Sequence, residues 1–126
     1  MDKHELQERM TAFAVRIIKM VDAMPSSVAG MALARQVVRS GTSPSANYRA
    51  ACIAKSDKDF VNKLKMVEEE LDETSHWLTL IMRSGLITAS RIDPLHQECV
   101  ELLSIIVKSI ITTKNRLKLE KSENKL

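Results

Sequence analysis

The sequence predicts an all-α protein folded as an antiparallel up-down four-helix bundle. Apolar residues recur in steps of three and four along most of the chain, which is the spacing of one helix face. Only 3% of the residues are aromatic and there are three glycines and three prolines, a composition that suits helices and disfavours a sheet. The 126 residues are enough for one domain with a buried core, so we expect a single domain over residues 1–126.

The first helix is predicted over residues 3–23. Its apolar seam is Leu6, Met10, Phe13, Ile17, Met20 and Met24. Pro25 ends this helix, and Ser26 or Ser27 is expected to cap the next one. Because the connection is short, the first two helices should be antiparallel neighbours.

The second helix is predicted over residues 27–54 and contains Pro44. A proline inside a helix removes one backbone hydrogen bond and clashes with the preceding turn. We expect a continuous helix that is kinked near Pro44; the alternative is a restart with Ser43 as N-cap. Four hydroxyls are expected to bond the freed backbone groups, those of Ser40, Thr42, Ser43 and Ser45.

The third helix is predicted over residues 58–83, with Ser56 or Asp57 as N-cap and Gly85 as a left-handed C-cap. Its seam is Phe60, Leu64, Val67, Leu71, Thr74, Leu78 and Ile81. Carboxylates occupy much of its other surface, between residues 68 and 73. They either form a solvated face or meet arginines of the second helix, in the same chain or in a neighbouring subunit. Trp77 is expected to lie in an interface.

The fourth helix is predicted over residues 91–119, with Asp93–Pro94 as an alternative start and a frayed end from Lys118. Its seam is Leu95, Cys99, Leu102, Ile106, Ile110, Thr113 and Leu117. A second apolar row consists of Val100, Leu103, Val107 and Ile111. Two rows exceed what one neighbouring helix needs, so the pattern predicts self-association.

Four runs of sequence carry a resemblance to a known family: RQVVRSGTSPSANYRAA, AKSDKDFVNKLK, EEELDET and HWL. Together they resemble the four-helix-bundle proteins encoded in intervening sequences of bacterial large-subunit ribosomal RNA genes, over roughly residues 13–80. The expected structural motif residues are Arg35, Gln36, Arg39, Ser43, Pro44, Asn47 and Trp77. For Arg35, Arg39 and Asn47 we expect hydrogen bonds between helices.

The resemblance implies a ring-like homo-oligomer, expected to be a homopentamer. It also implies a distant similarity to the accessory variability protein of diversity-generating retroelements, a basic pentameric bundle that binds nucleic acid and a reverse transcriptase. No established enzymatic activity comes with the family.

Enzyme chemistry has little support in the residues themselves. Glu73 with His76 and Asp93 with His96 have the spacing used by di-iron bundles, but residues 28–54 contain no acidic side chain to complete such a site. The serines near Pro44 have no histidine close in sequence, and no glycine-rich phosphate loop is present. We therefore expect no enzyme activity, no metal and no cofactor.

Cys52 and Cys99 are far apart and lack metal-site spacing, and neither a signal peptide nor a membrane-length apolar run is found. This pattern predicts a cytoplasmic protein with two reduced thiols and no membrane partner.

The net charge of +3 is unevenly distributed. Residues 35–65 carry seven basic and two acidic groups, residues 66–101 carry two basic and eight acidic groups, and residues 114–126 form a basic tail. The candidate nucleic-acid-binding residues are Arg49, Lys55, Lys58, Lys63 and Lys65. Binding of RNA or DNA would be directed at the backbone, since few aromatic residues could stack on bases. The alternative is a purely protein-directed adaptor, whose charged blocks serve subunit assembly or another protein partner.

Overall fold

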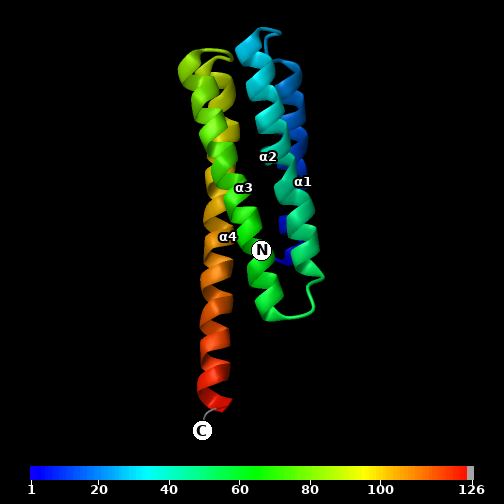
Figure 1. Cartoon of the computed structure of the whole chain (residues 1–126), viewed down its shortest axis with the longest axis vertical. Helices are drawn as coiled ribbons and strands as arrows, with labels where there is room; N and C mark the ends of the chain where they lie inside the picture. The colour runs from blue at the N-terminus through cyan, green and yellow to red at the C-terminus, as the bar shows by residue number, and fades with distance from the viewer. Residues whose placement is uncertain (125–126) are drawn as a thin grey trace.

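The computed structural model describes residues 1–124 and consists of four α-helices over that range. They are α1 (Lys3–Asp22), α2 (Val28–Cys52), α3 (Asp57–Ser84) and α4 (Ala89–Asn124). Consecutive helices pack side by side as α1 on α2, α2 on α3 and α3 on α4, whereas α1 and α4 touch least. Figure 1 shows the four rods running up and down, with α4 continuing past the turn between α2 and α3. The prediction of an all-α bundle of four helices is confirmed.

Three of the helices begin at a capping side chain. The side chains of Asp2, Ser27 and Ser56 each accept a hydrogen bond from the backbone N–H three residues later, at 2.8, 3.1 and 3.1 Å. These bonds satisfy donors that the first helical turn leaves free. Gly85 ends α3 with φ of 73°, a left-handed conformation that glycine adopts without strain. Ser27, Ser56 and Gly85 therefore have the capping roles that the sequence predicted.

The predicted seams form the core. In α3 every seam residue from Leu64 to Ile81 is buried, and in α4 every one from Leu95 to Thr113. Phe60 and Leu117, at the ends of these two seams, are half-buried. In α1 the buried residues are Leu6, Met10, Phe13, Ala14 and Ile17. A Cβ on Gly41 of α2 would lie 2.8 Å from Ile17, so the glycine permits α1 and α2 to approach closely.

The helix α2 runs without interruption through Pro44, so the predicted continuous helix is confirmed and the alternative, a restart at Ser43, is wrong. Because proline has no N–H, the carbonyl of Ser40 loses its helical donor. The hydroxyls of Thr42 and Ser43 instead donate to the carbonyls of Val38 and Arg39, four residues back. Ser45 donates to the carbonyl of Thr42, and the Ser40 hydroxyl bonds to Thr74 across the α2–α3 contact. The prediction that these hydroxyls replace the lost bond is therefore wrong, and the kink itself stays a prediction.

The helix α4 has 36 residues and is longer at both ends than the predicted range 91–119. Pro94 lies within its early turns and does not start it, so the alternative start is wrong. Beyond Pro94 the chain contains neither glycine nor proline, and lysine, leucine and glutamate favour helix, which explains why α4 continues to Asn124. Residues 125–126 of the predicted domain lie outside the described range. No helix within residues 1–124 is long and apolar enough to cross a membrane.

Candidate nucleic-acid interface

Three lysines from two helices converge towards the end of the bundle at which α2 connects to α3. Helical side chains lean towards the N-terminus of their own helix, and α3 and α4 run in opposite directions. Lys65 of α3 and Lys114 of α4 therefore lean towards each other. The positive charge of Lys65 lowers the pKa of Lys114, and Lys118 acts in the same direction. We call Lys65, Lys114 and Lys118 the cationic patch.

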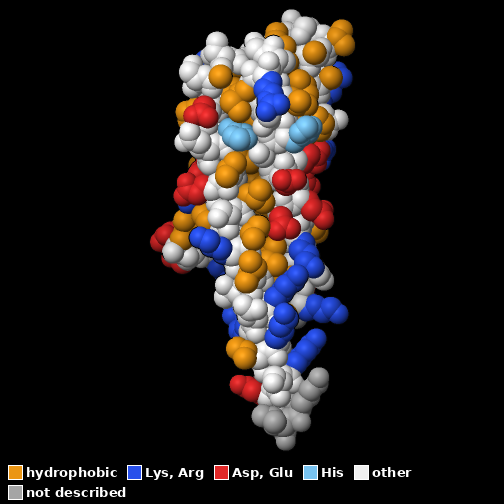
Figure 2. Space-filling view, turned by 90° about the vertical axis from the view of Figure 1, so that its left-hand side faces the viewer, with side chains coloured by type: hydrophobic (Ala, Val, Ile, Leu, Met, Phe, Trp, Pro, Cys, Tyr) orange, Lys and Arg blue, Asp and Glu red, His pale blue; other side chains and the backbone are white. Residues whose placement is uncertain are grey.

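The cationic patch is exposed and has little counter-charge. Within residues 1–124 none of its three lysines forms an ion pair, although the carboxylate of Glu68 is close enough to act on Lys114. Figure 2 shows basic side chains gathered on the lower part of the α3–α4 face, below a group of acidic side chains. Ammonium groups held close together favour a bound anion, and a phosphate backbone supplies a row of them.

The other predicted nucleic-acid-binding residues are not part of this patch. Lys63 forms an ion pair with Asp59 at 3.8 Å. Arg49 lies exposed in the last turn of α2, Lys58 is exposed near the start of α3, and Lys55 is exposed in the turn between these helices. Of the five predicted residues, the structure thus places Lys65 next to other cations from a distant part of the chain. The basic tail signalled Lys114 and Lys118, but their approach to Lys65 depends on the antiparallel packing of α3 on α4, which charge counts along the sequence do not give.

The motif arginine Arg39 is engaged between α2 and α3. It forms ion pairs with Glu73 and, at 3.5 Å, with Glu70, and it also donates a hydrogen bond to the Gln36 side-chain oxygen at 3.3 Å. The Trp77 indole donates to Glu73 at 3.2 Å. Burial raises the pKa of Glu70, whose Oε2 has no hydrogen-bond partner in the described residues. For Arg39, the alternative in which the carboxylates meet the second helix is therefore confirmed within one chain.

The remaining motif residues have mixed surroundings. Arg35 is exposed. Its guanidinium forms no ion pair with another helix within residues 1–124. Asn47 is half-buried and Pro44 is buried. Trp77 is half-buried, packs against the core, and lies 5.3 Å from the His76 ring, centroid to centroid.

The two acid-x-x-His pairs do not form a common site, because their side chains contact other residues. Glu73 contacts Arg39 and Trp77, while Nε2 of His96 lies 3.0 Å from the Ser75 hydroxyl and 3.4 Å from that of Thr79. In the described part of the chain, no group of three or more His, Cys, Asp or Glu side chains could hold a metal ion.

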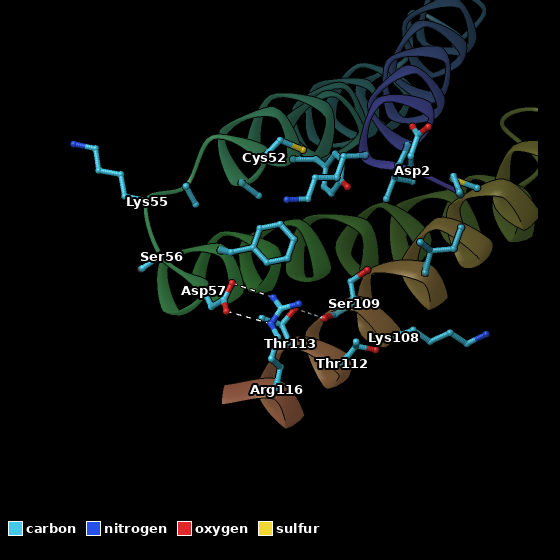
Figure 3. Close-up of a pocket in the computed structure, with 18 residues that line it drawn as sticks. Asp2, Cys52, Lys55, Ser56, Asp57, Lys108, Ser109, Thr112, Thr113 and Arg116 are labelled. Carbon is cyan, nitrogen blue, oxygen red and sulfur yellow. Dashed lines mark hydrogen bonds and ion pairs between the residues drawn. The ribbon is translucent and has the colours of Figure 1, made fainter. Parts of the chain in front are cut away.

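The contact between α1 and α4 is bridged by one arginine. The guanidinium of Arg9 donates two hydrogen bonds to Glu98, at 2.7 and 3.0 Å, and pairs with Glu101 at 2.8 Å. Below this bridge is a pocket of about 620 Å³, in which Arg116 donates to Asp57 at 3.0 and 3.2 Å. Figure 3 shows the Lys55 and Lys108 side chains extending away from this pocket. Because Arg116 is already paired with Asp57, we do not assign a ligand to this pocket.

Comparisons with known proteins agree with this architecture. Residues 2–108 match the family described as 23S rRNA-intervening sequence protein. A crystal structure of a protein with unknown function from the S23 ribosomal protein family of Bacteroides thetaiotaomicron is 31% identical, with a TM-score of 0.78. That likeness covers 83% of this chain and 97% of the other. A search of curated proteins found no match.

The family match ends before Lys114 and Lys118, so the cationic patch combines one residue inside the match with two beyond it. Because the match nevertheless covers most of the sequence, this chain belongs to the 23S rRNA-intervening sequence protein family.

Proposed function

We propose that this protein is a cytoplasmic, non-enzymatic scaffold that self-associates as a homopentamer and holds RNA or DNA by its phosphate backbone. The observation that carries the proposal is the convergence of Lys65, Lys114 and Lys118, which form no ion pair within residues 1–124. A phosphate placed among them would relieve the repulsion between the ammonium groups.

The chemistry of the patch favours backbone contacts over sequence reading. Lysine presents a compact charge without the planar fork that arginine uses to read guanine. No aromatic residue belongs to the patch, so it offers no surface on which bases could stack. Binding should therefore depend strongly on salt and weakly on sequence.

Self-association is supported by apolar surface on α4. Val100 is 46% exposed and Ile111 is 53% exposed, and both belong to the second apolar row. Leu103 and Val107 of the same row are half-buried. A neighbouring copy would cover this row and would also repeat the cationic patch around the assembly, which raises avidity for a long polyanion.

The test combines light scattering with titration of short RNA and DNA over a salt series. The variant Lys114→Glu/Lys118→Glu should weaken binding of either nucleic acid and lower the slope of log affinity against log salt by about 1 for each lysine. The matched control Arg35→Glu/Arg83→Glu changes the net charge equally on exposed residues outside the patch, and should retain most of the affinity.

Two further outcomes would place the binding site elsewhere or rule out nucleic-acid binding. If Lys58→Glu/Lys63→Glu abolishes binding while the Lys114→Glu/Lys118→Glu variant binds normally, the contact lies at the start of α3 and the patch is not the site. If the unaltered protein forms an oligomer that ignores both nucleic acids at low salt, the protein-directed adaptor replaces the nucleic-acid scaffold.

A further inference from the structure

Two hollows on the surface carry opposite charges. The first, of about 250 Å³, lies between α1 and α4 and is lined by the cations Arg16, Lys19 and Arg91 over apolar residues that include Ile87 and Leu95. The second, of about 360 Å³, lies between α3 and α4 and is lined by Glu68, Glu69 and Asp72 with Leu103 and Val107. We call them the basic hollow and the acidic hollow. Each combines one sign of charge with an apolar floor.

The charges that line both hollows are not held in ion pairs within residues 1–124. In the described range, none of the six charged residues that line them forms an ion pair. The nearby Arg9, in contrast, is fully engaged by Glu98 and Glu101. Glu68 lies within electrostatic reach of Lys114, which leaves Glu69 and Asp72 as the freest carboxylates of the acidic hollow.

Exposed apolar side chains continue from each hollow. On α4, Val100 precedes Leu103 by three residues and Ile111 follows Val107 by four, so all four lie on one helix face. On α1, Val15 is 44% exposed and lies four residues before Lys19. An apolar centre with a charged rim is the usual composition of a protein interface.

We infer that the basic hollow of one copy of this chain docks on the acidic hollow of a neighbouring copy. The inference rests on the self-association proposed above and names the surfaces that meet. The occupant is a second copy because the same chain carries both partners, with three cations on one side and three carboxylates on the other. Since the two hollows are different surfaces, the contact is head-to-tail, and a repeated head-to-tail contact closes into a ring when its rotation allows.

Charge reversal tests this pairing directly, with the mass measured by sedimentation and light scattering. Glu69→Arg/Asp72→Arg makes the acidic hollow basic, and Arg16→Glu/Arg91→Glu makes the basic hollow acidic. Each variant should dissociate by at least about 10-fold more readily than the unaltered chain, because like charges then face each other. The variant with all four changes restores opposite charges and should recover the oligomer.

Glu120→Arg/Glu123→Arg, which changes charge equally at exposed positions of α4 outside both hollows, should leave the mass unchanged. Circular dichroism checks that every variant remains helical. If the unaltered chain is an oligomer and the helical four-change variant stays dissociated, or if neither reversal alters the mass, the pairing is wrong while self-association stands. If the unaltered chain is a monomer at every concentration tested, the self-association and the pairing fail together.

Discussion

The α2–α3 contact and the α1–α4 contact close the bundle in different ways. Between α2 and α3, the buried hydroxyls of Ser40 and Thr74 bond at 2.9 Å, and Arg39 reaches across to Glu73. Among the helix pairs that pack together, α1 and α4 have the smallest contact. The Arg9 ion pairs lie there between the 620 Å³ pocket and the basic hollow. The first contact is packed, whereas the second is bridged.

The difference separates stability from interaction within one small fold. A packed contact loses stability when a partner is removed, because a buried polar group cannot turn to water. The side chains of a bridged contact are partly exposed to solvent. Their removal therefore lowers stability less, and they stay available for contacts with other molecules. The basic hollow lies along the bridged contact.

The largest effect is expected in the packed contact. Thr74→Val should lower the free energy of unfolding by about 1–3 kcal/mol, because the fully buried Ser40 hydroxyl loses its partner. Urea denaturation measures this change. The double variant Ser40→Ala/Thr74→Val removes both polar groups and should recover part of the loss. A double variant that is less stable than Thr74→Val alone would show that the hydroxyl pair is not the cause.

The sequence predicted the packed contacts better than the bridged one. The seams of α3 and α4 followed from 3-4 spacing alone, since each helix has one face that must be buried whatever its neighbours are. The length of α4 was missed because a charged stretch without an apolar seam gives no signal that distinguishes an exposed helix from a frayed end.

The candidate sites required the fold. Lys65 and Lys114 are 49 positions apart, and only the antiparallel α3–α4 pairing makes their side chains converge. Likewise, Arg91 joins Arg16 around the basic hollow although 75 positions separate them in the sequence. Charge counts along the sequence indicated a basic block and an acidic block, but they could not show which charges neutralise each other.

The two cysteines extend the comparison to chemistry. Cys99 is fully buried and donates to the Leu71 carbonyl at 3.2 Å, whereas Cys52 is half-buried and lines the pocket at the α1–α4 contact. Burial, aided by nearby carboxylates, raises the pKa of the Cys99 thiol from 9.0 to about 12. Because the folded state then holds the proton more tightly, this contribution to stability is present below pH 9 and is lost as pH rises towards 12.

Unfolding free energy at pH 10 should therefore be lower than at pH 8 by on the order of 1 kcal/mol through this thiol, and the dependence should be weaker in Cys99→Ala.

Iodoacetamide should modify Cys52 in the native protein and Cys99 only after urea is added, as peptide mass mapping would show. Equal rates for both thiols in the native state would mean that the α3–α4 contact opens as readily as the α1–α4 contact.

The smallest effect is expected at the bridge itself. Arg9→Met keeps the apolar stem of the side chain and removes its charge, and should cost less than about 1 kcal/mol in urea denaturation because the pair is partly exposed. Arg16→Met, at a cation without an ion pair in residues 1–124, is the matched control and should change stability even less. A loss from Arg9→Met that exceeds the loss from Thr74→Val would reverse the ranking of the two contacts. The Arg9 bridge would then stabilise the bundle as strongly as packing does, and the basic hollow beside it would lie along a rigid contact rather than a weak one.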